Sequence, residues 1–103
     1  MEIGKTEKKG GKTMIVHILF DGRVQGVGFR YSVMQKALEH GIKGWVRNND
    51  DGMVEMEGEG TEEQIKMFVG SLHTWPNRFI KVTNKKITYL DIEKGYKNFS
   101  IVG

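Results

Sequence analysis

The order in which two hydrophobic periodicities alternate constrains this chain more than any other feature of its sequence. Short apolar or alternating runs typical of β-strands occupy residues 14–20, 42–48, 53–58 and 79–89, and a last short run occupies 99–101. Helical stripes, with apolar side chains three and four residues apart, follow the first and the third of these runs. The order β-α-β-β-α-β predicts an α+β, ferredoxin-like fold, with two helices on one face of an antiparallel sheet and a short fifth strand.

Local signals indicate where several of these elements begin and end. The run at 14–20 (MIVHILF) is almost continuously apolar, which predicts an interior strand covered on both faces, and Asp21 and Gly22 are expected to end it. The first helix is expected over residues 30–40. Thr61 is expected to cap the second helix, because it begins a Thr-Glu-Glu-Gln sequence that matches the capping-box pattern.

Two further signals concern the faces of the sheet. In the fourth strand the alternation of apolar residues slips between Val82 and Ile87, which predicts a β-bulge or an irregular end there. Along the third strand Glu55, Glu57 and Glu59 alternate, which is typical of a solvated strand face and not of paired acid catalysts. We therefore expect these carboxylates to lie in water.

Composition sets the domain organisation and excludes several classes of protein. A chain of 103 residues has room for one domain, expected over residues 14–103, and the polar residues 1–13 are expected to form a flexible tail. No apolar run approaches the roughly 20 residues that span a bilayer, so no membrane segment is expected. The absence of cysteine excludes thiol catalysis and fits a cytoplasmic location. The net charge of +3 favours anionic partners in general.

The first strand and the first helix are joined by a glycine-rich segment, GRVQGVGFR at residues 22–30. Its glycines allow backbone N–H groups to converge into a nest that attracts an anion, and the helix start adds its own unpaired N–H groups. Arg30 adds a planar, permanently charged group that can bind two phosphate oxygens. The segment indicates a phosphate cradle, with a structural turn and solvated arginines as the alternative. It matches neither the Walker loop nor the dinucleotide-binding fingerprint.

The second strand and the turn after it form another candidate stretch, GWVRNNDDG at residues 44–52. Asn48 lies where the strand is expected to meet the turn. On this local evidence alone, the favoured interpretation is that Asn48, Asn49 and Asp50 are simply turn formers.

Together the two segments closely resemble the two signature motifs of the acylphosphatase family. GRVQGVGFR matches the family's phosphate loop, and GWVRNNDDG matches its strand–turn motif G-W-V-x-N-x-x-D-G. The resemblance extends from about Ile15 to Ile101. It implies that Arg30 binds the phosphate and that Asn48 orients the attacking water. It also implies that backbone amides grip the phosphate oxygens along the loop formed by Val24, Gln25, Gly26, Val27, Gly28 and Phe29.

The resemblance implies hydrolysis of the carboxyl-phosphate anhydride of acyl phosphates to a carboxylate and inorganic phosphate. It implies no metal ion, cofactor or covalent intermediate, and His17, His40 and His73 have no spacing typical of a metal site. The expected partners are a small acyl phosphate and inorganic phosphate, and we expect a monomer without nucleic-acid or membrane partners. The stretch Thr74–Arg78 departs from the small-residue and proline pattern common in the family.

Two other classes of function remain as alternatives. RNA-recognition modules share this element order, but they carry aromatic residues on the third strand, where this chain has the acidic sequence MVEMEG at 53–58. The second alternative is a regulatory or carrier-binding module that resembles an acylphosphatase without turnover. Because both Arg30 and Asn48 are retained, the enzyme is the favoured hypothesis.

Overall fold

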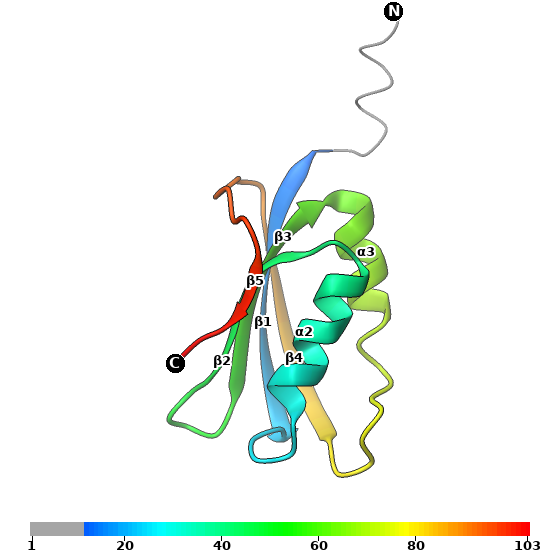
Figure 1. The fold of residues 1–103 in the computed structure, drawn as a ribbon, viewed down its shortest axis with the longest axis vertical. Coiled ribbons are helices and arrows are strands. Elements are labelled where there is room, and N and C mark those ends of the chain that lie inside the picture. Colours follow the sequence, from blue (N-terminus) through cyan, green and yellow to red (C-terminus); the bar gives the residue numbers. More distant parts are fainter. Residues whose placement is uncertain (1–11) are drawn as a thin grey trace, which may run out of the picture.

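The computed structural model describes residues 12–103, and its elements follow the predicted order (Figure 1). Of the tail expected over residues 1–13, only Lys12 and Thr13 are among the described residues, and Thr13 is already part of the sheet. Within the described range no helix has the length and apolar character needed to cross a membrane. The elements are β1 (Thr13–Arg23), α2 (Phe29–Glu39), β2 (Lys43–Asn48), β3 (Val54–Thr61), α3 (Glu62–Gly70), β4 (Lys81–Leu90) and β5 (Phe99–Ile101).

The sheet has the strand order β4-β1-β3-β2-β5 and confirms the ferredoxin-like α+β fold. β1 pairs antiparallel with both β3 and β4, and β2 pairs antiparallel with β3. The sheet is nevertheless mixed, because β5 pairs parallel with β2. The path of the chain explains this difference. β4 ends at the end of the sheet where β2 begins, and residues 91–98 cross there, so β5 runs in the direction of β2 (Figure 1).

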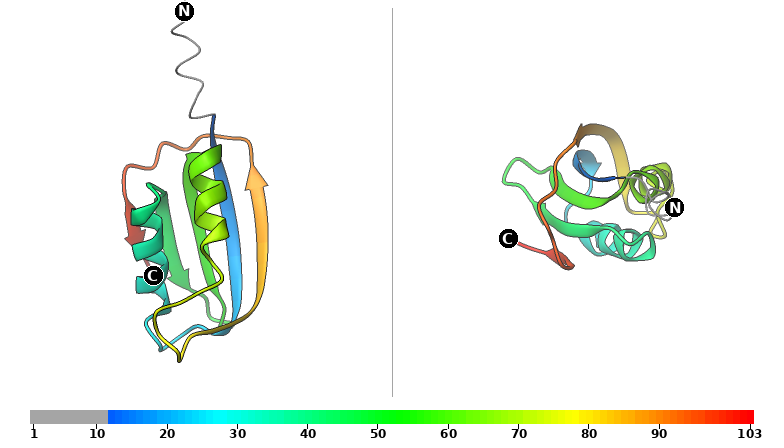
Figure 2. Two further views of the ribbon diagram at one scale, coloured as in Figure 1. Left: turned by 90° about the vertical axis from the view of Figure 1, so that its right-hand side faces the viewer. Right: turned by 90° about the horizontal axis from the view of Figure 1, so that it is seen from above.

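Both helices pack on one face of the sheet, as predicted (Figure 2). α2 contacts β2 and β5, and α3 contacts β3 and β1. Burial of the apolar surface between these layers is the main favourable contribution to folding. Ile15 and Val16 point to opposite faces of the interior strand β1 and are both fully buried, which confirms the expected coverage of both faces. The core between the layers includes Val16, Ile18, Phe20, Val33, Ala37, Val46, Val54, Met56, Ile65 and Phe68.

α3 begins at the predicted cap. The Thr61 hydroxyl accepts a hydrogen bond from the Gln64 N–H at 3.1 Å, and the Gln64 side-chain oxygen accepts one from the Thr61 N–H at 2.8 Å. This reciprocal pair satisfies two backbone donors, one at the cap and one that the start of the helix would otherwise leave unpaired. The capping box fixes the point at which β3 turns into α3.

β1 is longer than predicted, because Asp21 and Gly22 do not end it. The strand continues to Arg23 by pairing with β4, and the register shifts between Asp21 and Gly22. The backbones approach closely at this point, since a Cβ atom on Gly22 would lie 2.1 Å from the Lys81 carbonyl oxygen. Glycine is therefore required by the pairing of the two strands here, although in the sequence it is typical of a strand end.

The irregularity in β4 lies where the broken alternation predicted it. Asp21 pairs with Asn84 and Gly22 pairs with Val82, so Thr83 is an extra residue on the β4 side. A bulge of this kind resets the alternation of side chains. As a result, Val82 and Ile87 both pack against the core although they are five positions apart, which in a regular strand would place them on opposite faces.

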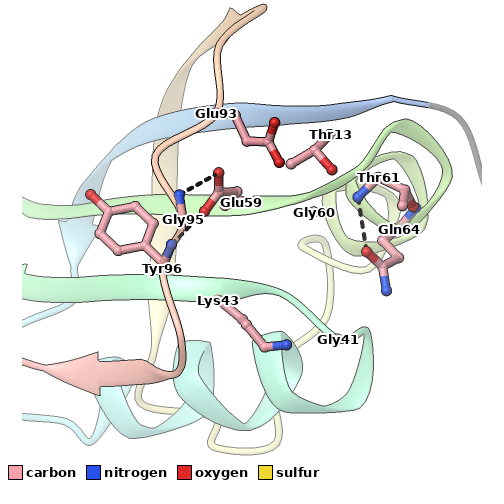
Figure 3. A pocket seen from close by; sticks show the side chains of 10 residues that line it. All are labelled: Thr13, Gly41, Lys43, Glu59, Gly60, Thr61, Gln64, Glu93, Gly95 and Tyr96. Carbon is pink, nitrogen blue, oxygen red and sulfur yellow. Dashed lines mark hydrogen bonds between the residues drawn. The ribbon is translucent and has the colours of Figure 1, made fainter.

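The open face of the sheet is not solvated at Glu57 and Glu59, which corrects the expectation for these residues. Their exposed fractions are 7% and 6%. The connection from β4 to β5 supplies their hydrogen-bond donors. Glu59 accepts hydrogen bonds from the N–H groups of Gly95 and Tyr96 at 3.1 and 2.7 Å (Figure 3) and from the N–H of Lys94 at 2.6 Å. Glu57 accepts from the Lys94 ammonium at 2.7 Å and from the Tyr96 hydroxyl at 2.5 Å. Both carboxylates thus hold the connection onto the sheet.

These contacts predict that the free energy of unfolding depends on pH. Burial raises the pKa of Glu59, but hydrogen bonds from three backbone N–H groups outweigh it, so the pKa lies below its ordinary value of 4.5. A carboxyl group whose pKa is lowered by folding stabilises the protein above its unfolded pKa, and this contribution is lost as pH falls through the folded pKa. We expect Glu59→Gln to lower the free energy of unfolding near pH 7 by about 1–3 kcal/mol, because buried donors lose a charged acceptor.

Urea unfolding of the wild type and Glu59→Gln between about pH 7 and about pH 3 checks this prediction. The difference in the free energy of unfolding between wild type and variant should shrink toward acid pH, because there the wild-type carboxyl is protonated and no longer a charged acceptor. Glu93→Gln is the matched control, because Glu93 is an exposed carboxylate in the same connection. A deficit that stays constant across the pH range would contradict the assignment of the effect to ionised Glu59.

Candidate functional site

Three connections lie together at one end of the sheet, opposite to the end crossed by residues 91–98 (Figures 1 and 2). They are the loop from β1 to α2 at residues 24–28, which we call the glycine loop, the turn from β2 to β3 at residues 49–53, and the connection from α3 to β4 at residues 71–80. The first two belong to the two signature stretches. The fold therefore brings both stretches to the same end of the molecule.

The two ends of the glycine loop are anchored in the core. The side chains of Val24 and Phe29 are each only 1% exposed. Phe29 packs edge-on against Phe20, with ring centroids 4.9 Å apart, and lies 4.7 Å from the ring of Trp75. Aromatic contacts of this kind bury much area and have specific geometry. They fix the point at which the loop becomes α2.

The backbone of the loop is open between these anchors. Gly26 and Gly28 have φ angles of 78° and 77°, in the left-handed region that favours glycine. Gly28 is the N-cap of α2, and no side chain caps this helix start. Between residues 12 and 103, no group accepts a hydrogen bond from the N–H groups of residues 25–28. These donors, together with the positive end of the helix dipole, form an environment that favours an anion.

The side chain of Gln25 ties the glycine loop to the β2–β3 turn. Its Nε2 donates hydrogen bonds to the carbonyl oxygens of Asn49 and Met53 at 2.8 and 2.9 Å. The turn is closed by a bond from the Asn49 N–H to the same Met53 oxygen at 2.8 Å. The sequence indicated only a backbone contribution from Gln25, so this bridge is an addition to the predicted role.

Asn48 is the last residue of β2, pairs with Val54 of β3, and is half-buried. Its Oδ1 atom is buried and accepts no hydrogen bond from any residue in the described part of the chain. A buried polar atom is normally satisfied, so this carboxamide retains hydrogen-bonding capacity for a water or a ligand. The neighbouring side chain of Arg47, by contrast, already has partners within the protein. It donates hydrogen bonds to Glu55 at 2.9 Å and to the Asn49 side chain at 3.2 Å.

Arg30 lies in the first turn of α2, directly after the glycine loop, and is half-buried. This first turn contains no acidic residue. Among residues 12–103 no carboxylate forms an ion pair with Arg30, in contrast to Arg47 and Lys94. Its positive charge is therefore available to an anion at the helix start.

The site has one further residue that the sequence did not point to. Asn77, in the connection 71–80, donates a hydrogen bond from Nδ2 to the carbonyl oxygen of Val27 at 2.8 Å. In the sequence, the stretch Thr74–Arg78 that contains it was notable only for departing from the pattern common in the family. No local signal identifies this contact, because it joins residues 50 positions apart.

The histidines do not form a metal centre within the described range, where no group of three or more His, Asp or Glu side chains is arranged to hold an ion. His17 contacts Glu55 at 2.6 Å, and His73 contacts the Gly70 carbonyl at 2.8 Å. Both are thus explained by contacts within the protein.

The fold and the glycine loop define a small ferredoxin-like α+β protein with free backbone donors at a helix start. The acylphosphatase family model matches residues 16–101. The chain is 44% identical over 87 residues to an acylphosphatase of Geobacillus thermodenitrificans, covering 84% of this chain and 92% of that relative. It is 45% identical over 85 residues to an acylphosphatase of Bacillus subtilis, covering 82% and 92%. The chain belongs to the acylphosphatase family, the enzymes that hydrolyse the acid-anhydride bond of acyl phosphates.

Solved structures agree with this assignment. The crystal structure of acylphosphatase from Bacillus subtilis superimposes with a TM-score of 0.82 at 42% identity, covering 87% of this chain and 99% of that one. The crystal structure of full-length HypF in the phosphate- and nucleotide-bound form superimposes with a TM-score of 0.80 at 34% identity, covering 89% of this chain but 12% of that one. The same fold thus occurs as a small enzyme and as a part of a much larger protein.

Proposed function

We propose that the backbone N–H groups of the glycine loop and the guanidinium of Arg30 bind the phosphate of the acyl phosphate, and that Asn48 orients the attacking water. The observation that carries this proposal is the bridge from Gln25, whose side chain holds the turn after Asn48 at 2.8 and 2.9 Å. The bridge joins the glycine loop to the turn that begins directly after Asn48. This link supports assigning the anion-binding loop and the carboxamide of Asn48 to one site.

The chemistry of an acyl phosphate suits such a site. Phosphoryl transfer needs little covalent assistance, so positioning and charge stabilisation supply most of the catalysis. Negative charge is spread over the equatorial phosphoryl oxygens, where the loop N–H groups and Arg30 act as preorganised donors. Because the backbone donors are fixed by the anchored loop, they need little reorganisation during the reaction.

The water is activated mainly by its position. Asn48 can accept a hydrogen bond from the water through Oδ1 and donate one through Nδ2, which orients the water along the line of the breaking bond. A carboxylate is a good leaving group and requires no acid. A phosphoryl oxygen can accept the proton of the water, so no protein base is required. The reaction then proceeds without a metal ion and without a covalent intermediate.

Hydrolysis of benzoyl phosphate in the presence of a chelator tests this function. We expect turnover without added metal and competitive inhibition by inorganic phosphate, because the product occupies the same cradle. Activity that depends on added magnesium would contradict the metal-free mechanism. Phosphate binding without any hydrolysis would instead favour the non-catalytic module.

We also propose that the enzyme is a monomer in the cytoplasm and that it does not bind nucleic acid. The absence of cysteine supports the location, since the reducing cytoplasm disfavours disulfides. RNA-recognition modules bind through an open sheet face that carries aromatic side chains. Here β3 carries Glu57 and Glu59 on that face, and the connection 91–98 is bonded to them. A gel shift with RNA at low salt is expected to show no complex.

A further inference from the structure

We propose that Asn77 is a positioning residue for phosphate binding, which aims the backbone N–H of Gly28 at the anion by holding the carbonyl of Val27. The inference rests on the proposed function of the glycine loop and extends it to the connection 71–80. Asn77 itself contacts the back of the loop and not the substrate. Its contribution is to the orientation of one peptide unit.

The side chain of Asn77 is held at both ends. Its Nδ2 donates to the Val27 carbonyl at 2.8 Å, and its Oδ1 accepts from the Phe79 N–H at 2.8 Å. The Asn77 carbonyl also accepts from the Ile80 N–H at 3.1 Å, which closes the turn. If the carboxamide were rotated by half a turn, its NH2 group would face the Phe79 N–H, donor against donor. The local turn therefore sets which end of the amide reaches Val27.

The geometry of the peptide bond transfers this orientation to Gly28. A trans peptide unit is planar, and its carbonyl and N–H point in opposite directions. When Asn77 holds the Val27 carbonyl toward the connection 71–80, the Gly28 N–H must point away from that connection. This N–H belongs to the N-cap of α2 and has no acceptor within residues 12–103.

The loop needs such a restraint, because glycine makes its backbone easy to turn. Val27 lies between Gly26 and Gly28, which both have positive φ angles, and glycine reaches many backbone conformations at little cost. A rotation of the Val27–Gly28 peptide would present a carbonyl oxygen to the phosphate and replace an attraction by a repulsion. Gln25 restrains the other side of the loop, through the β2–β3 turn. The two side-chain amides thus hold the loop from two neighbouring connections.

The test compares Asn77→Ser with the wild type. A serine hydroxyl can still accept the Phe79 N–H and so retain the turn, although more weakly, but it is too short to reach Val27. We expect the inhibition constant of inorganic phosphate and the KM for benzoyl phosphate to rise about three- to ten-fold, with kcat changed less than about two-fold. Thr74→Ala is the matched control, because Thr74 is exposed in the same connection. It should leave these constants unchanged.

NMR chemical shifts of backbone amides give a second measurement, which a merely structural role of Asn77 would leave unchanged. In the wild type, inorganic phosphate should shift the backbone N–H resonances of Gly26 and Gly28. In Asn77→Ser the shift of Gly28 should shrink while that of Gly26 persists. An unchanged inhibition constant together with an unchanged Gly28 shift in the variant overturns the proposal.

The wild-type titration separates this inference from the proposed function, whether or not the variant folds. If phosphate shifts other loop amides and leaves Gly28 unmoved, Asn77 does not aim that donor and the proposal is overturned. If phosphate shifts no amide of residues 24–30, the glycine loop is not the phosphate cradle, and the proposed function fails with it.

Discussion

Replacing Arg30 with alanine is expected to weaken phosphate binding by about 100-fold or more, measured as rises in the KM for benzoyl phosphate and in the inhibition constant of inorganic phosphate. Each hydrogen bond to a charged group contributes roughly 1.5–3 kcal/mol, and a guanidinium can make two such bonds to one phosphate. Arg30 is half-buried, and the other residues of the first helical turn, Phe29, Tyr31 and Ser32, carry no positive charge that could replace it. Its loss removes binding in the ground state and in the transition state alike.

Arg23→Ala is the matched control for this experiment, because Arg23 is exposed at the end of β1 in the same signature stretch. It should change both constants only slightly. Arg30→Lys should fall between the wild type and Arg30→Ala, since an ammonium keeps the charge and loses the planar fork. Phosphate should also raise the melting temperature of the wild type and not that of Arg30→Ala. Equal affinities for phosphate in all these variants would exclude Arg30 from the cradle.

Replacing Asn48 with alanine is expected to lower kcat by about 100-fold with little change in KM. The carboxamide is proposed to hold the water and not the phosphate, so its interaction is made on the reaction path. Its buried Oδ1 accepts no hydrogen bond from residues 12–103, and this free capacity is what the alanine variant removes. Affinity for inorganic phosphate should therefore persist in the inactive variant.

Asn49→Ala provides the matched control for Asn48, with the same chemical change one residue later. The Asn49 side chain accepts a hydrogen bond from Arg47 at 3.2 Å, whereas its bond to Gln25 uses the backbone carbonyl and survives the substitution. Asn49→Ala should retain most of the kcat. A loss of phosphate affinity in Asn48→Ala, with kcat unchanged, would assign Asn48 to binding and not to the water.

The fold could be predicted from the sequence wherever the signal is local. The capping box at Thr61 needs only four consecutive residues, and the structure contains it as expected. The slip between Val82 and Ile87 also lies within one strand, and the extra residue Thr83 accounts for it. Such signals are reliable because the residues that make up the pattern are the same residues whose conformation it predicts.

The prediction was wrong where a distant segment determines the outcome. Glu59 alternates like a solvated residue, yet its donors come from a connection 35 to 37 positions further along the chain. Gly22 is typical of a strand end, but pairing with β4 continues the strand past it. β5 was expected in an antiparallel sheet, and its parallel direction follows only from the path of residues 91–98.

The same distinction between local signals and distant contacts applies to the candidate site. The sequence identified Arg30, Asn48 and the glycine loop through two motifs, and their catalytic roles stay predictions that the variants above address. It could not identify the contacts that join the motifs. The bridge from Gln25 spans 24 and 28 positions, and the contact from Asn77 to Val27 spans 50. Spacing along a chain does not reveal such pairs before the topology is known.

The bridges of Gln25 and Asn77 have a consequence for the refolding of the denatured enzyme. The proposed site is complete only when the connections after β1, β2 and α3 have all docked, so we expect a chain with native helices and an incomplete sheet to hydrolyse acyl phosphates much more slowly. Helices form far faster than contacts between distant segments. After dilution from urea, catalytic activity should therefore return later than helical circular dichroism, and its rate reports the closing of the whole tertiary structure.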